Sequence, residues 1–254
     1  MKLRAHGTPP VYFTFPLLER LGVPHATTSR HCPGVASFTE PIAADAGRGP
    51  FGPDLAPVLT GAGLAAARIA YARQVHGADV AEAPPAGGFA GRADVLATTE
   101  RGLALAIFTA DCLAIALVDL DARALVLAHV GWRGTARGAT QAAVAALSAR
   151  GGRPERARVA IAPSIGPCCY EVDEPVMSAF REAYGPTSER WFRPTGSGHA
   201  TLDLWAANEA LLAETGVAPA RIENARLCTA CHPELLYSYR RGHRGRLVTL
   251  AALP

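Results

Sequence analysis

Two histidines and one cysteine stand where apolar runs of this sequence give way to glycine or polar turns. His76 ends the run ARIAYARQVH, Cys112 ends LALAIFTADC, and His129 ends ALVLAH. A sheet fixes side chains at its strand ends, while the following turns leave room for a ligand. Two imidazoles and one thiolate are a good ligand set for zinc, and three protein ligands leave one position open for water or substrate. We therefore predict a catalytic zinc site at these three residues.

Cys112 also fits a second chemistry, that of a nucleophile with His76 or His129 as its base, as in cysteine hydrolases. A zinc-bound thiolate is a poor nucleophile, so the two roles exclude each other in one state, and the residue types leave both open. Asp111 adjoins Cys112, but neighbouring strand residues point to opposite faces. Asp111 is therefore a candidate acid or base if the strand bends there, and otherwise it caps the turn.

The segment GWRGTARG, residues 131–138, leads from His129 into a predicted helix. Glycines at a helix start, here Gly131 and Gly134, let backbone amides approach an anion, which the positive end of the helix dipole favours. Together with Arg133 and Arg137 they form a candidate phosphate site beside the metal. An ordinary strand-to-helix turn with solvated arginines would have the same sequence.

Composition narrows the classes of function. Lys2 is the single lysine, so P-loop phosphate chemistry and Schiff-base catalysis are not expected, and anion recognition must rest on arginine or backbone amides. The formal net charge of +3 is small and dispersed, which argues against nucleic-acid binding. No uncharged apolar run approaches the roughly 18 to 20 residues that span a bilayer, and the N-terminus does not resemble a signal peptide. We expect a cytoplasmic protein whose six cysteines are thiols or ligands.

The motif CTACH, residues 228–232, matches the pattern for c-type haem attachment. Haem c is attached outside the cytoplasm, so this role is not expected. A second zinc site at Cys228 and Cys231 would need another cysteine pair, for which Cys168 and Cys169 are the candidates in the sequence. Structural thiols are the stronger expectation at this motif, and the roles of the four cysteines stay open.

Copper oxidase chemistry is not expected either. Multicopper sites use many histidines, often in His-x-His pairs, and none of the eight histidines is so paired. The weak axial methionine of a blue-copper site would have to be Met1 or Met177, the two methionines of the chain.

Short apolar runs alternate with helical patterns from about Ile69 onward. The expected strands are residues 103–108, 113–118, 124–129, 158–162 and 247–251, and the expected helices are residues 135–149, 174–184 and 203–215. Strands and helices interleave without a regular βαβ period, which predicts a mixed α/β fold with mixed sheets. The length of 254 residues suits a single domain, with residues 33–63, rich in Gly and Pro, as a long surface loop.

Five blocks of the sequence resemble those of a known family. QVHGADV (74–80), FTADCLAI (108–115), AHVGWRGTARG (128–138), SIGPCCYEV (164–172) and CTACHPELLYSYRRGHRGR (228–246) are similar to the signature blocks of the YfiH-like laccase-domain proteins, in the expected order. These proteins are described as purine nucleoside phosphorylases and were formerly described as polyphenol oxidases. The resemblance implies a zinc ion bound by His76, Cys112 and His129. It also implies mixed sheets packed face to face and covered by helices.

The activities implied by the resemblance are phosphorolysis of adenosine, inosine, guanosine and methylthioadenosine, and deamination of adenosine. The partners would be a purine nucleoside and phosphate. Some bacterial members are linked instead to editing of peptidoglycan precursors, so a metal-free Cys-His hydrolase and a non-enzymatic partner protein are the alternatives. Residues 38–64 depart from the family, because its Asn-Leu-Gly, Gly-Asp and Asn-Arg elements are not recognisable there. If those elements frame the nucleoside, this protein binds another substrate or binds purines weakly.

Overall fold

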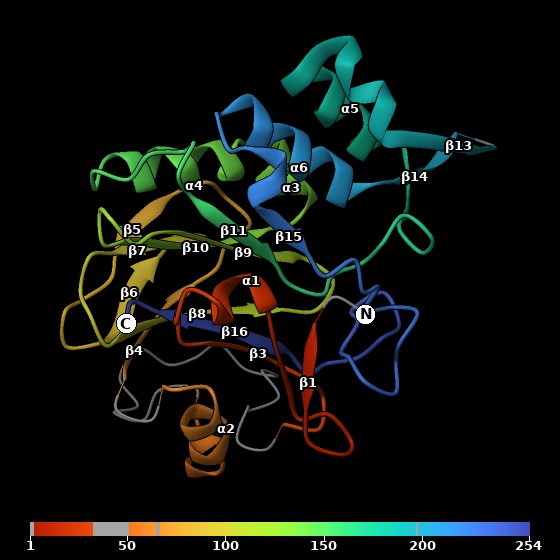
Figure 1. Cartoon of the computed structure of the whole chain (residues 1–254). Coiled ribbons are helices and arrows are strands. Elements are labelled where there is room, and N and C mark those ends of the chain that lie inside the picture. The colour runs from red at the N-terminus through yellow and green to blue at the C-terminus, as the bar shows by residue number, and fades with distance from the viewer. Residues whose placement is uncertain (1–2, 33–50, 65–66, 197) are drawn as a thin grey trace.

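Two mixed β-sheets packed face to face form the centre of the molecule (Figure 1). The structure is a computed structural model, and it describes residues 3–32, 51–64, 67–196 and 198–254. The larger sheet has, in spatial order, strands β1 (Arg4–His6), β2 (Tyr12–Thr14), β3 (His25–Thr28), β16 (Leu247–Ala252), β8 (Leu103–Thr109), β4 (Arg68–Arg73) and β6 (Gly88–Arg92). The smaller sheet has strands β15 (Ile222–Asn224), β11 (Arg158–Ile161), β9 (Leu113–Asp119), β10 (Ala124–Val130), β7 (Val95–Thr98) and β5 (Val80–Glu82). The mixed α/β fold predicted from the sequence is confirmed.

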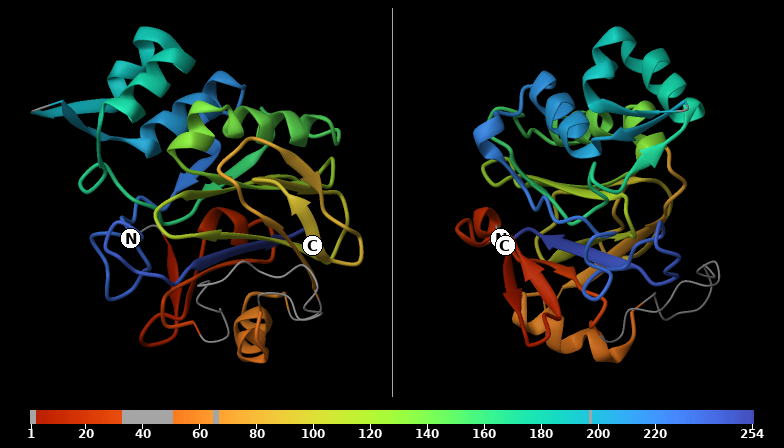
Figure 2. Two further views of the ribbon diagram at one scale, coloured as in Figure 1. Left: turned by 180° about the vertical axis from the view of Figure 1, so that it is seen from behind. Right: turned by 90° about the vertical axis from the view of Figure 1, so that its right-hand side faces the viewer.

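Helices cover the outer faces of both sheets, so that the molecule has four layers (Figure 2). Over the smaller sheet lie α3 (Trp132–Ala136), α4 (Ala139–Ser148), α5 (Glu174–Tyr184), η2 (Gly185–Trp191), α6 (Leu204–Glu214) and η3 (Pro219–Arg221). A short third sheet of β12 (Glu171–Val172), β14 (His199–Leu202) and β13 (Phe192–Gly196) adjoins α5. Against the outer face of the larger sheet lie η1 (Pro53–Leu55) and α2 (Ala56–Gly61). Helix α1 (Pro16–Glu19) instead lies beside the space between the sheets, where Leu18 is buried and the amide of Leu17 donates to Glu223 of β15.

The strands at the centre are buried on both faces, which explains their unbroken apolar sequences. Along β9, Leu113, Ile115 and Leu117 pack against the helices, whereas Ala114, Ala116 and Val118 face the other sheet. Strand β10 alternates in the same way, and by this period of two His129 faces the interior between the sheets. A histidine at that depth must have hydrogen-bond partners.

Most of the expected strands and helices are present, with bounds that differ by one or two residues at most from those expected. One helix differs more. Residues 135–149 were expected to form a single helix, and they belong to two helices separated at Gly138. Gly138 has φ +82°, a left-handed conformation that interrupts the helix and that glycine adopts readily. The first of the two helices, α3, also begins three residues earlier than expected, at Trp132.

The loop predicted for residues 33–63 is only partly tested. Residues 33–50 lie outside the described residues, and residues 53–61 form η1 and α2 instead of a loop. Val58 of α2 is buried with Tyr12 and Ala26, so this helix packs against the larger sheet. Within the described ranges, no helix is long and apolar enough to cross a membrane.

Candidate metal centre and its pocket

The candidate site lies where the chain crosses from one sheet to the other. Strands β8, β4 and β6 are parallel neighbours in the larger sheet, and each is followed in sequence by a strand of the smaller sheet. Their three crossing connections therefore leave the same end of the molecule. His76 lies in the β4–β5 connection, Asp94 in the β6–β7 connection and Cys112 in the β8–β9 connection. His129, near the end of β10, is level with the start of β9, because Val130 pairs with Leu113.

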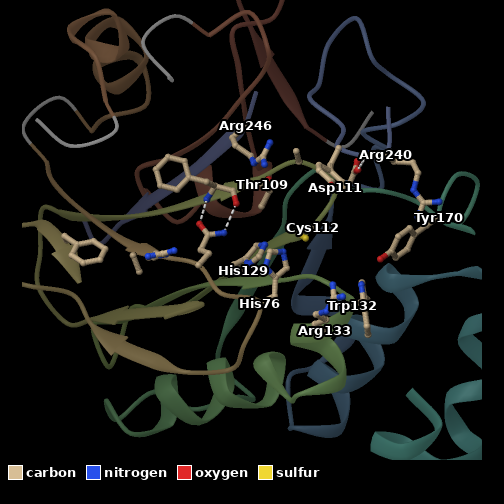
Figure 3. A pocket seen from close by; sticks show the side chains of 17 residues that line it. His76, Thr109, Asp111, Cys112, His129, Trp132, Arg133, Tyr170, Arg240 and Arg246 are labelled. Carbon is tan, nitrogen blue, oxygen red and sulfur yellow. Dashed lines mark hydrogen bonds between the residues drawn. The ribbon is translucent and has the colours of Figure 1, made fainter. Parts of the chain in front are cut away.

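This topology brings the three predicted metal ligands together (Figure 3). His76, Cys112 and His129 each offer one ligand atom, and these atoms all lie within 4.8 Å of one another. The two imidazole rings are 4.8 Å apart between centroids and nearly perpendicular, at 80°. His129 is buried, Cys112 is half-buried and His76 is exposed, so the cluster is open on one side. Its donor set and its open side fit a zinc ion with a free coordination position.

Asp94, which the sequence analysis did not identify, organises this cluster. Its side chain is fully buried, and its Oδ1 accepts a hydrogen bond from His129 Nδ1 at 2.8 Å. The carboxylate also accepts hydrogen bonds from the backbone amides of Val75, His76 and Gly77, at 2.7 to 3.2 Å. Burial opposes ionisation, but the bonds from His129 and these amides outweigh it and lower the pKa of Asp94. With Nδ1 donating to Asp94, Nε2 of His129 is left for a ligand.

Charge within the cluster favours the thiolate form of Cys112. Burial alone would raise the pKa of this thiol, but the charge of His129 and the hydrogen bonds from His129 and His76 lower it to about 6. Conversely, the pKa of His129 is raised despite burial, because Cys112 and Asp94 stabilise the imidazolium. A metal binds the thiolate of cysteine and the neutral imidazole of histidine, so ligation would use the thiolate of Cys112 and displace the proton from His129.

The backbone around the ligands is held in uncommon conformations. His76 has φ +59° and Asp111 has φ +90°, and such angles in residues other than glycine persist only where the surroundings enforce them. The amide of His76 is held by Asp94, and its carbonyl accepts a hydrogen bond from Arg137 Nη1 at 3.0 Å. Gln74 holds the same connection to β8, because its amide group exchanges two hydrogen bonds with the backbone of Phe108.

The chain bends at Asp111, and such a bend is what the sequence analysis required for Asp111 to face the same site as Cys112. Strand β8 ends at Thr109, and Asp111 is one of the residues that line the cavity. Both of its oxygens are occupied, however. Oδ1 accepts a hydrogen bond from Thr229 Oγ1 at 2.6 Å, and Oδ2 accepts one from the backbone amide of Arg240 at 2.7 Å. Asp111 thus joins the Cys112 turn to the C-terminal segment, and its role as acid or base stays a prediction.

Of the two glycines predicted to contact phosphate, Gly131 has a packing reason to be glycine, whereas Gly134 has more room. A Cβ on Gly131 would lie 2.7 Å from the Cys112 sulfur, so any side chain there would displace the ligand. A Cβ on Gly134 would lie 3.4 Å from the carbonyl oxygen of Gly77. Both glycines are buried, and a phosphate contact by their amides stays a prediction.

The cluster forms the floor of a cavity of about 670 Å³, within the range of ligand-binding pockets. Aromatic side chains supply much of its wall, namely Phe89, Phe108, Trp132, Tyr170 and Tyr239. Among the described lining residues there are also four arginines, Arg73, Arg133, Arg240 and Arg246, and one acid, Asp111. This surface is suited to a ligand that combines a flat ring with negative charge.

Two of the arginines that line the cavity, Arg133 and Arg240, lie against aromatic rings (Figure 3). Arg133 lies over the ring of Trp132, with its guanidinium carbon 4.2 Å from the ring centre. Arg240 lies 5.2 Å from the ring centre of Tyr170 and donates a hydrogen bond to the carbonyl of Glu171. Of the two arginines expected at the phosphate, Arg133 lines the cavity, whereas Arg137 is not among the described lining residues and donates to the carbonyl of His76. Tyr170 and Arg240 were not predicted individually, although they lie in two of the blocks that resemble the family. Asp94 left a weaker signal, a lone acid between two apolar runs.

Comparison with known proteins identifies the family. Residues 55–254 match the family described as "Multi-copper polyphenol oxidoreductase laccase", and the chain belongs to it. A protein of Deinococcus radiodurans named purine nucleoside phosphorylase is 37% identical over 249 residues, which cover 94% of this chain and 93% of the relative. YlmD of Geobacillus stearothermophilus, also named purine nucleoside phosphorylase, is 38% identical over 187 residues, covering 69% of this chain and 68% of YlmD.

A third relative and two solved structures complete the comparison. A prokaryotic protein named adenosine deaminase RL5 is 36% identical over 148 residues, covering 58% of this chain and 56% of RL5. The crystal structure of YlmD from Geobacillus stearothermophilus matches 98% of each chain with a TM-score of 0.81 and 29% identity. The structure of Bacillus licheniformis YfiH matches 99% of each chain with a TM-score of 0.85 and 23% identity, which shows the shared fold.

Proposed function

We propose that this protein is a zinc-dependent purine nucleoside phosphorylase that also deaminates adenosine. The observation that carries the proposal is the open cluster of two histidines and a thiolate at the floor of a cavity lined by aromatic rings and arginines. Relatives over much of the chain are named purine nucleoside phosphorylase or adenosine deaminase, which supports the same activities here. Adenosine, inosine, guanosine and methylthioadenosine are the proposed substrates, and the cytoplasm is the proposed location.

His76, Cys112 and His129 would hold the zinc ion, with Asp94 fixing the orientation of His129. A bound Zn²⁺ would supply a Lewis acid that can activate water or polarise a substrate at neutral pH. The ligand set favours zinc over copper, despite the family's name. Among the described residues the other group of candidate ligands consists only of cysteines, so a histidine-rich multicopper cluster has no counterpart there.

The other lining residues would bind and orient the substrates. Phosphate would lie against Arg133, which reaches the cavity from the start of α3, and the purine would stack on the aromatic wall. Asp111 is the proposed group that carries protons to or from the leaving group. Each of its oxygens accepts one hydrogen bond, from Thr229 or from the amide of Arg240, and a carboxylate oxygen has a second lone pair that can take a proton.

Product analysis tests the proposal. Purified protein is incubated with adenosine with and without phosphate, and the products are separated by chromatography. We expect adenine and ribose 1-phosphate only when phosphate is present, and inosine without it. Both activities should fall at least a hundredfold in Cys112→Ala and after treatment with a chelator, and zinc should restore the wild-type protein. Activity that survives both treatments would refute the role of the metal site.

A Cys-His hydrolase acting on a peptidoglycan precursor is the alternative, and one observation favours it. Cys112, His129 and Asp94 lie in the order of a nucleophile, a base and an orienting acid, with the pKa of the thiol lowered. His76 argues for the metal instead, because a hydrolase triad has no use for a second imidazole at the thiolate. The hydrolase would remain active in chelator and would be inactivated by alkylation of Cys112, whereas zinc should protect this thiol from alkylation.

A further inference from the structure

Four cysteines outside the site described above meet at one point of the structure. Cys168 and Cys169 lie in the turn before β12, and Cys228 and Cys231 lie after β15. The sulfur atoms of this four-cysteine cluster all lie within 4.8 Å of one another. None of these four described cysteines forms a disulfide. Tertiary structure thus provides the second cysteine pair that a metal site at CTAC requires.

The geometry of the four-cysteine cluster fits a tetrahedral ion. Zinc–sulfur bonds of about 2.3 Å place the sulfurs of a tetrahedral site about 3.8 Å apart. The Cys231 sulfur is 3.4 Å from that of Cys168 and 3.4 Å from that of Cys169, and the remaining pairs extend to at most 4.8 Å. The two 3.4 Å separations are thus within about 0.4 Å of the tetrahedral value, and they exceed the roughly 2.05 Å of a disulfide bond.

Hydrogen bonds at the buried end of the cluster favour a thiolate. The backbone amide of Gly166 donates to the sulfur of Cys228 at 3.2 Å. Burial opposes ionisation throughout the cluster: the pKa is lowered at Cys228 by this amide and that of Cys231, but it is raised at Cys168 and Cys169, so a metal would have to displace the thiol protons of these two residues. Arg241 lies close by, because its Nε donates to the carbonyl of Ala230 inside the CTAC motif. A cation there offsets the negative charge of a metal bound by thiolates.

We propose that the four-cysteine cluster binds a second Zn²⁺ ion, in a closed structural site separate from the catalytic one. Four thiolates leave no position for water, which is typical of structural zinc and unlike the three-ligand cluster. On binding, zinc replaces the thiol protons, which are released to solvent. This site adds to the proposed function and does not depend on it, since it uses different ligands.

The second ion would tie together two segments that build the wall of the cavity. Ser164 exchanges backbone hydrogen bonds with the 227–229 segment, from its amide to the carbonyl of Leu227 and from the amide of Thr229 to its carbonyl. Tyr170 follows Cys169 directly and lines the cavity, and Thr229 holds Asp111. A zinc ion at the four-cysteine cluster would therefore fix the positions of Tyr170 and Asp111 relative to the catalytic ligands.

Zinc content of protein purified without added metal tests the proposal. Cys168→Ser and Cys231→Ser remove exposed ligands of the second site, Cys112→Ser removes a ligand of the first, and Cys32→Ser is the control because Cys32 belongs to neither cluster. We expect two zinc ions per chain in the wild type and in the control. One ion should remain in each of the other variants. Because the first site has its own test in Cys112→Ser, failure of either site is recognised separately.

Wild-type zinc content that is unchanged in Cys168→Ser and Cys231→Ser would overturn the proposal. X-ray absorption at the zinc edge of the wild type gives a test that needs no variant to fold: two sites predict between two and three sulfur ligands per zinc on average, whereas the first site alone predicts one. A thiol count on protein denatured in chelator without reductant should give six. Two missing thiols would show a disulfide in the cluster and would also overturn the proposal.

Discussion

Replacing Asp94 with asparagine tests how far one buried carboxylate controls the metal site. The substitution keeps the shape of the side chain but turns one acceptor oxygen into an NH₂ donor. In the less damaging orientation this NH₂ group replaces Oδ2 and faces the amide of Gly77, 2.7 Å from the present oxygen. Oδ1 then still accepts from His129 and His76, but without the negative charge that strengthens both bonds.

The lost hydrogen bond and the lost charge set the expected decreases in stability and in zinc affinity. One buried amide without an acceptor costs about 1 to 3 kcal/mol, which for a chain of this length lowers the melting temperature by about 2 to 12 °C. Carboxylates that orient a metal-binding histidine contribute about 10- to 100-fold to metal affinity. We therefore expect Asp94→Asn to bind zinc about 10 to 100 times more weakly, since His129 is no longer held as a fixed, electron-rich ligand.

A second buried aspartate provides the matched control. Asp119 lies at the opposite end of β9 from Cys112 and accepts hydrogen bonds from the amide of Arg153 and the guanidinium of Arg156. Asp119→Asn should lower the melting temperature to a similar extent without changing zinc affinity. Affinity is measured by competition with a chromophoric chelator, and stability by thermal unfolding of the apo-proteins. If Asp94→Asn bound zinc within twofold of the wild type, the orienting role assigned to Asp94 would be wrong.

Three further predictions concern single positions. Gly131→Ala should displace the Cys112 sulfur and abolish tight zinc binding while the fold persists. Gly134→Ala, whose new Cβ would lie 3.4 Å from its nearest neighbour, should weaken zinc binding less. Metal analysis measures the bound zinc of both variants, and circular dichroism checks their fold. Arg133→Gln should raise the KM for phosphate about tenfold or more and leave deamination of adenosine within threefold; equal losses in both rates would contradict a phosphate role. Burial opposes ionisation of Asp119, but its hydrogen bonds lower its pKa, so its stabilisation is complete above about pH 4 and is lost as the pH falls through the folded-state pKa. The difference in urea midpoint between wild type and Asp119→Asn should therefore shrink from about pH 6 to about pH 3, and a constant difference would show that ionisation contributes nothing.

The central strands could be predicted from the sequence because their physical requirement is local. Residues 103–108, 113–118 and 124–129 are apolar without interruption, which requires burial on both faces and therefore a sheet covered on each side. The helix at residues 174–184 was predicted at its observed bounds for a similarly local reason, an amphipathic run that ends at Gly185. The break at Gly138 was missed, because residues 135–149 have high helix propensity and only the backbone angle of one glycine divides them.

The candidate metal ligands were also accessible from the sequence, since residue type and position at the end of an apolar run suffice to select His76, Cys112 and His129. Their partner Asp94 was not, because a single aspartate in a short connection has no chemical signature of its own. Its role comes from the parallel arrangement of β4, β6 and β8, which brings three connections to one end of the molecule. The separation of residues along the sequence does not predict that these three connections lie close together.

The four-cysteine cluster likewise depends on features that the sequence predicts and on contacts that only the tertiary structure provides. The sequence by itself determined which elements form and which residues can bind a metal, because burial pattern and side-chain chemistry are properties of single segments. Only the tertiary structure decided that Cys168 and Cys169 meet Cys228 and Cys231, that Asp111 is held by Thr229, and that arginines gather at one cavity. These are long-range contacts, set by how the sheets pack and where the connections cross, and no local pattern encodes them.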